Sequence, residues 1–236
     1  MRLLLLSNST APGRRYLEHA GEALAAALDG VRRLVFVPFA LADHDGYTAQ
    51  VAQALDSYGV HVTGAHEGDP IESLDAAQAV FVGGGNTFRL LRELYARELL
   101  APIRHRAGRG TVYIGSSAGT NVACPSIRTT NDMPIVQPPS FEAAGLVPFQ
   151  INPHYLDPIP GHMGETREER IEQFLEENDV PVLAMREGTW LTRVDSSLTL
   201  GGEPVGARLF RRGAAPEEIE SGADLSPLLE IAGRYR

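Results

Sequence analysis

Residues 111–123 read TVYIGSSAGTNVA, an apolar run followed at once by a Gly-x-Ser-x-Gly pattern. The run at 111–114 is β-branched and aromatic, which favours a buried strand. A serine between glycines at the end of such a strand is typical of a sharp strand-to-helix turn that exposes one hydroxyl. This stretch therefore predicts a nucleophile elbow with Ser117 at its tip. The helix that follows places its first N–H groups, from Ala118 on, where they can stabilise a developing oxyanion.

The rest of the chain repeats this alternation of strand and helix. Apolar runs that read as strands lie at 3–6, 34–38, 60–62, 79–82, 149–152 and 181–185, and segments with apolar residues at helical spacing separate most of them. This pattern predicts one α/β domain over residues 1–236, with a mainly parallel sheet and helices on both faces. Three further runs, at 191–194, 198–200 and 207–210, predict a C-terminal β-meander.

A second glycine-rich turn, Gly83-Gly84-Gly85-Asn86-Thr87, follows the predicted strand at 79–82. Because active sites of such sheets lie at the carboxyl ends of the strands, both glycine turns are expected at the same edge. No Gly-Lys-Ser/Thr follows the glycines, and they lack Gly-x-Gly-x-x-Gly spacing. A nucleotide site is therefore not expected here.

Composition limits the class of partner and the compartment. The net charge of −9 argues against a nucleic-acid or anionic membrane surface. The single cysteine, Cys124, cannot form an internal disulfide, and no Cys/His spacing predicts a metal site. The apolar run at 3–6 is too short for a signal peptide or a membrane span. We therefore expect a cytoplasmic protein without nucleic-acid or membrane partners.

A serine nucleophile needs a general base and an acid that orients it. Among seven histidines, His154 follows a predicted strand and so lies at the expected catalytic edge, while His162 in a nearby polar loop is the second choice. From the residues alone, the third group stays open among three carboxylates at strand ends or in structured loops: Asp132, Asp157 and Glu187.

Several longer segments together resemble the peptidase E family, the α-aspartyl dipeptidases. The resemblance runs from Leu3 to about Phe210 and is most specific at 83–88 (GGGNTF), 117–119 (SAG), 127–136 (IRTTNDMPIV), 151–154 (INPH) and 164–167 (GETR). It implies an α/β fold related to the class I glutamine amidotransferases, with a serine in place of their cysteine.

Carried over residue by residue, the resemblance makes Ser117 the nucleophile and His154 its general base. It implies an oxyanion hole formed by the backbone amides of Gly85 and Ala118. For the third catalytic group the family offers two matching positions, Glu187 and Asp132, and Glu187 is favoured.

The resemblance also matches Arg167 to a position that recognises the aspartyl carboxylate of the substrate, a role that suits the planar guanidinium fork. It implies hydrolysis of dipeptides, and some tripeptides, with N-terminal aspartate. No metal or organic cofactor is expected, and the protein is expected to be a monomer or homodimer.

Two other functions stay open. A cyanophycinase-like exopeptidase shares the GGGN and SAG elements, although the segment TTNDMP at 129–134 favours the dipeptidase. A noncatalytic amidotransferase-like binding module is the alternative outside the enzymes. It requires that Ser117 and His154 lie apart in the fold.

Overall fold

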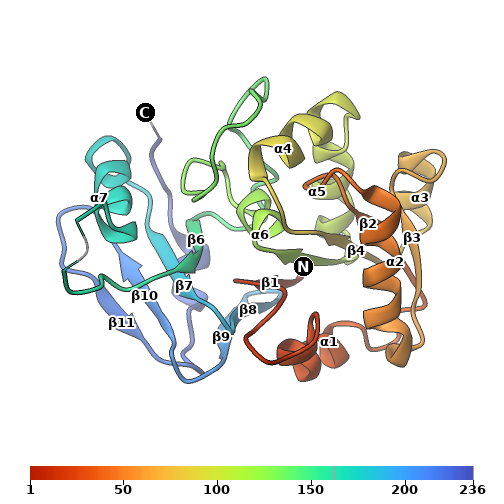
Figure 1. Ribbon diagram of the computed structural model, residues 1–236, viewed down its shortest axis with the longest axis horizontal. Helices are drawn as coiled ribbons and strands as arrows, with labels where there is room; N and C mark the ends of the chain where they lie inside the picture. Colours follow the sequence, from red (N-terminus) through yellow and green to blue (C-terminus); the bar gives the residue numbers. More distant parts are fainter. Residues whose placement is uncertain (162, 236) are drawn as a thin grey trace.

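Two β-sheets lie side by side in the computed structural model, which describes residues 1–161 and 163–235 (Figure 1). The strands are β1 (Arg2–Leu6), β2 (Arg33–Val37), β3 (His61–Gly64), β4 (Ala79–Val82), β5 (Val112–Ser116), β6 (Gln150–Tyr155), β7 (Val182–Arg186), β8 (Thr189–Val194), β9 (Ser197–Gly202), β10 (Ala207–Phe210) and β11 (Glu217–Ile219). The helices are α1 (Gly21–Ala27), α2 (His44–Leu55), α3 (Pro70–Ala76), α4 (Thr87–Ala96), α5 (Leu100–Gly108), α6 (Ala118–Ala123) and α7 (Arg167–Glu177), with short 3₁₀ turns at Glu18–Ala20, Asp56–Tyr58 and Ser226–Glu230.

The larger sheet has the strand order β3-β2-β4-β5-β1-β8-β9 within the described residues. Its first five strands are parallel, β8 runs antiparallel to β1, and β9 runs antiparallel to β8. The predicted α/β fold with a mainly parallel sheet is thus confirmed. Both glycine-rich turns follow neighbouring parallel strands, β4 and β5, and so lie at one edge of the sheet.

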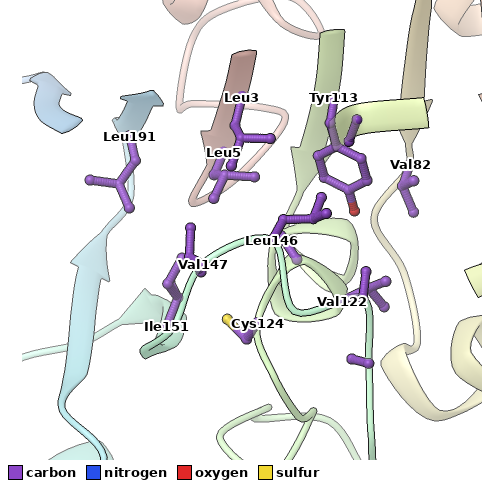
Figure 2. Close-up of a cluster of buried hydrophobic side chains, with 14 of the residues drawn as sticks. Leu3, Leu5, Val82, Tyr113, Val122, Cys124, Leu146, Val147, Ile151 and Leu191 are labelled. Carbon is purple, nitrogen blue, oxygen red and sulfur yellow. The ribbon is translucent and has the colours of Figure 1, made fainter. Parts of the chain in front are cut away.

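Helices cover both faces of this sheet, which explains why its central strands are apolar throughout. Along β1, Leu4 and Leu6 pack with residues of α1 and α2, whereas Leu3 and Leu5 pack on the opposite face with residues of α3, α4, α5 and α6. Figure 2 shows part of the cluster that contains Leu3 and Leu5, in which Val122 and Cys124 are also buried. No helix in the described part of the chain has the length and apolar character to cross a membrane.

The smaller sheet has the order β11-β10-β7-β6 among the described strands, with β6 and β7 parallel. The predicted C-terminal meander is therefore only partly correct, because its third strand, at 207–210, belongs to this smaller sheet. The β8–β9 hairpin continues the larger sheet, but β10 pairs with β7 instead of β9. The side chain of Phe210 on β10 packs there with Tyr155, Ile171 and Leu175, so burial against α7 determines which sheet β10 joins. The strands β6, β7 and β10 were predicted from local pattern, but β11 in the tail was not, and the pairing of β10 depends on packing between distant segments.

Two helix starts lie close to the candidate site. Asn86 caps α4, its side chain accepting a hydrogen bond from the Arg89 N–H at 3.0 Å. Thr166 and Glu169 form a capping box at the start of α7, which makes Arg167 the first residue of that helix. Helix α4 therefore begins at Thr87, the last residue of the GGGNT segment, and α7 begins at the predicted substrate-binding arginine.

Candidate active site

Ser117 occupies a strained turn between β5 and α6. Its backbone has φ 53° and ψ −107°, a region that residues with side chains rarely adopt and that persists only where the surroundings enforce it. Its N–H donates to the carbonyl of Leu6 at 3.1 Å, and the hydroxyl of Thr120 donates to the same carbonyl at 2.7 Å. The end of β1 therefore holds both sides of the turn.

The glycines around Ser117 permit close packing of the turn. A Cβ on Gly115 would lie 2.7 Å from the carbonyl oxygen of Gly119, and one on Gly119 would overlap the carbonyl oxygen of Val82 on β4. A Cβ on Gly84 would lie 3.2 Å from that of Ser117. The two glycine-rich turns are thus in contact, which requires that both lack side chains at these points.

The imidazole of His154 lies between Ser117 and a carboxylate. Its Nε2 is 2.9 Å from Ser117 Oγ, and its Nδ1 is 2.7 Å from Glu187 Oε1. His154 lies within β6, where the pairing with β7 shifts register between Asn152 and Tyr155 and φ of His154 is 54°. Such an irregularity redirects a side chain, and here it accompanies an imidazole aimed at the elbow.

The other candidate carboxylates have different partners. Asp132 accepts hydrogen bonds from the N–H and hydroxyl of Thr87 at 2.7 and 2.6 Å, and Asp157 forms a bidentate pair with Arg186 at 2.7 Å for both bonds. Within residues 1–161 and 163–235, neither carboxylate contacts His154. The structure therefore brings Glu187, and not Asp132, to the imidazole. The second-choice histidine, His162, lies outside the described residues.

Two backbone amides face the space beside the elbow. Ala118 is the first residue of α6, a position at which a helix leaves the amide without an intrahelical acceptor. Gly85 has φ 129°, which glycine alone adopts readily, and its N–H meets no acceptor among the described residues. Both amides are free to donate to a substrate oxygen.

Arg167 is a half-buried cation near the site. Burial lowers the pKa of its guanidinium below the usual value, while the carboxylate of Asp132 acts in the opposite direction. In the part of the chain that the structure describes, this guanidinium forms no ion pair or hydrogen bond with the protein. It lines a cavity of about 260 Å³ together with apolar residues such as Leu156 and Ile159. The other charged residues of this cavity already have partners: Asp157 pairs with Arg186, and Glu165 pairs with Arg170. A cation without a fixed partner in a cavity is suited to bind an anionic ligand.

Two polar residues that sequence reasoning missed hold the site together. Ser7 Oγ donates to the carbonyl of Met185 at 2.9 Å and accepts from the N–H of His154 at 3.0 Å. Asn8 Oδ1 accepts from the N–H of Gly188, next to Glu187, at 2.8 Å. Both residues are buried directly after a central parallel strand. Their position after a strand could have identified them from the sequence, because active sites in such sheets lie at the carboxyl ends of the strands.

The described residues contain no group of three or more His, Cys, Asp or Glu side chains arranged to hold a metal ion. Cys124 is a free, buried thiol whose pKa burial raises to about 12.

A mainly parallel α/β sheet with a serine, a histidine and a carboxylate in hydrogen-bond contact at its carboxyl edge defines a class of enzymes that use a serine hydroxyl as nucleophile. The family model for peptidase family S51 matches residues 3–201. The chain belongs to peptidase family S51.

Relatives with high identity over their whole length agree with this assignment. Peptidase E of Streptomyces coelicolor is 61% identical over 238 residues, covering 100% of this chain and 98% of that relative. A Drosophila melanogaster protein named "Probable alpha-aspartyl dipeptidase" is 52% identical over 235 residues, covering 97% of each chain. The crystal structure of a peptidase from an acI-B1 Actinobacterium has the same fold, with a TM-score of 0.70 and 15% identity over 95% of this chain and 96% of that one.

Proposed function

We propose that this protein is a serine-type dipeptidase that hydrolyses dipeptides, and some tripeptides, with N-terminal aspartate. The observation that carries the proposal is the continuous contact from Ser117 Oγ through the His154 imidazole to Glu187 Oε1, at 2.9 and 2.7 Å. The names of its relatives, peptidase E and alpha-aspartyl dipeptidase, support the substrate class.

In this mechanism His154 Nε2 removes the proton from Ser117 Oγ as the oxygen attacks the scissile carbonyl. Glu187 accepts a hydrogen bond from His154 Nδ1, which keeps the imidazole in the required tautomer and stabilises its positive charge. The amides of Gly85 and Ala118 donate to the oxygen that becomes negative in the tetrahedral intermediate. The protonated imidazole then passes its proton to the leaving amine. In the second half of the reaction His154 removes a proton from water, the water oxygen attacks the acyl-enzyme ester, and the bond to Ser117 Oγ breaks. The imidazole returns the proton to Ser117 Oγ, and aspartate is released.

Arg167 would pair with the side-chain carboxylate of the substrate's aspartate. Its guanidinium is half-buried and has no protein partner among the described residues, so a substrate carboxylate would restore interactions that burial removes. The charge also provides a local positive field in a protein whose net charge is −9. We further infer that the protein is a single-domain, cytoplasmic enzyme that acts as a monomer or homodimer.

The noncatalytic binding module is disfavoured because it requires that Ser117 and His154 lie apart, whereas their side chains are 2.9 Å from each other. A cyanophycinase-like activity is disfavoured by the Drosophila melanogaster relative, which is named "Probable alpha-aspartyl dipeptidase".

Incubation with matched Asp-Xaa, Asn-Xaa, Glu-Xaa and isoaspartyl dipeptides tests the proposal. We expect release of free aspartate from Asp-Xaa peptides by the wild-type protein. Ser117→Ala should reduce kcat on the order of 10⁴- to 10⁶-fold while the protein stays folded, because triad members act as a unit. Substantial turnover by the folded Ser117→Ala protein, or preferred cleavage of isoaspartyl peptides, would rule the proposal out.

A further inference from the structure

Three of the four amides in the turn from Gly83 to Asn86 are held by hydrogen bonds. The Gly83 N–H donates to the carbonyl of Val37 at 3.1 Å, and the Asn86 N–H donates to the carbonyl of Ala40 at 3.0 Å. The Gly84 N–H donates to a side chain, the hydroxyl of Tyr47 on α2, at 2.9 Å. Among residues 1–161 and 163–235, Tyr47 therefore supplies the one side-chain hydrogen bond to the amides of this glycine-rich turn.

The position of Gly84 determines where the free amide of Gly85 points. Consecutive glycines have no side chains that restrict the backbone, so external contacts must hold them. On one side Gly84 packs against the elbow, where an added Cβ would lie 3.2 Å from the Ser117 Cβ and 3.3 Å from the Ser116 carbonyl oxygen. On the other side Gly84 is held by the phenol. Together these contacts set the distance between the Gly85 N–H and Ser117 Oγ.

Tyr47 is itself firmly placed. It is buried, its ring stacks edge to face on Phe36 with 4.8 Å between centroids, and it fills the space that a Cβ on Gly83 would need. The hydroxyl of Tyr16 donates to the Tyr47 hydroxyl at 3.3 Å. Burial raises the pKa of both phenols, so both remain neutral hydrogen-bonding groups at neutral pH.

We propose that Tyr47 is a positioning residue for the oxyanion hole, acting through the Gly84 N–H, with Tyr16 as its support. The inference rests on the proposed function, because it assumes that the Gly85 amide stabilises the transition state. Tyr47 is buried and its hydroxyl bonds to the Gly84 N–H, so loss of the hydroxyl should affect stabilisation of the tetrahedral intermediate but not ground-state binding. Misplacement of a catalytic group by about 1 Å can cost on the order of 100-fold in rate.

Tyr47→Phe tests the inference, with Tyr58→Phe as the matched control. The Tyr58 hydroxyl likewise forms a hydrogen bond with the backbone, but as a donor, to the carbonyl of Gly21 at 3.3 Å, and Tyr58 lies in the 3₁₀ turn that follows α2. With an Asp-Xaa dipeptide, Tyr47→Phe should lower kcat by about 10- to 100-fold with KM within about two-fold. Tyr58→Phe should leave kcat unchanged. Comparable melting temperatures of the two variants would exclude global destabilisation as the cause.

A second measurement isolates the transition-state effect. A dipeptide-like aldehyde that forms a tetrahedral adduct with Ser117 should bind Tyr47→Phe more weakly by about the factor lost in kcat/KM, while the affinity for free aspartate stays the same. Tyr16→Phe, which leaves the Gly84 bond in place, should show a smaller loss of the same kind and provides the test if Tyr47→Phe does not fold.

An unchanged kcat and aldehyde affinity in either folded variant would overturn the inference, as would equal losses for the aldehyde and for aspartate. These results differ from failure of the proposed function, in which wild-type protein does not cleave Asp-Xaa peptides or Ser117→Ala retains activity. In that case both the proposed mechanism and the positioning role of Tyr47 would be wrong.

Discussion

At the scale of single residues, the site depends on which groups each side chain meets. Glu187 and Asp132 are both carboxylates near the carboxyl edge of the sheets, but their partners differ. Glu187 contacts the imidazole of His154, whereas Asp132 contacts the N–H and hydroxyl of Thr87 at the start of α4. The same functional group thus lies against an imidazole in one position and at a helix N-terminus in the other.

Exchange of each acid for its amide separates these roles. Glu187→Gln should lower kcat by about 100-fold or more, because an amide can stabilise the wrong imidazole tautomer. Asp132→Asn should change kcat much less and should lower stability by about 0.5 to 1 kcal/mol, since it removes a negative charge from a helix N-terminus. Steady-state kinetics and thermal melting of both variants check this, and the reverse order of kcat would assign the catalytic role to Asp132.

Arg167 is expected to determine preference for aspartate. Arg167→Met should reduce kcat/KM for Asp-Xaa by about 30-fold or more, while Asn-Xaa changes little, so the Asp/Asn ratio should fall. Arg170→Met is the control, because that guanidinium already pairs with Glu165 at 2.7 Å. An Asp/Asn ratio that stays at the wild-type value in Arg167→Met would mean that another cation recognises the substrate.

At the scale of elements, the elbow between β5 and α6 exists because α6 approaches β4 very closely. The approach leaves no room for a Cβ on Gly119, because the carbonyl oxygen of Val82 occupies the space that this Cβ would need. Backbone atoms of a central strand cannot move aside without disturbing the sheet. The glycine at this position is therefore a packing requirement as well as part of a serine motif.

Gly119→Ala should consequently destabilise the fold by about 1 to 3 kcal/mol or more through overpacking. Gly108→Ala provides the matched control: this glycine is the last residue of α5, and an added Cβ meets nothing within 4 Å. It should raise stability by up to about 1 kcal/mol, because alanine favours helix. Urea unfolding of both variants measures the difference, and equal midpoints would contradict the packing argument.

At the scale of the whole molecule, two sheets meet around one buried cluster that includes strands of both. Cys124 follows α6 and is buried in this cluster together with Ile151 of β6 and Leu5 of β1 (Figure 2). Because its thiol has a pKa raised to about 12 by burial, almost no thiolate forms near neutral pH. Its reactivity therefore reports whether the cluster is open.

We expect Cys124 to resist alkylation by iodoacetamide in the native protein and to react stoichiometrically in urea. Mass spectrometry of samples taken over time gives the fraction labelled. The labelling rate in intermediate urea should follow the global unfolding transition seen by circular dichroism. Fast labelling under native conditions would instead indicate that the segment around α6 opens locally.

The alternation of strands and helices, the parallel core of the sheet and the serine at the tip of the β5–α6 turn could all be predicted from the sequence alone. Each of these follows from residues that are neighbours along the chain: apolar runs, helical spacing and glycines that bound a turn. The choice among three carboxylates did not follow, because Glu187 is 33 residues from His154, which is 37 residues from Ser117. The pairing of β10 with β7 and the contact between Tyr47 and Gly84 could likewise not be predicted from the sequence. Such contacts form only when distant segments close on one another, and their partners are selected by burial and hydrogen bonding across the assembled sheets.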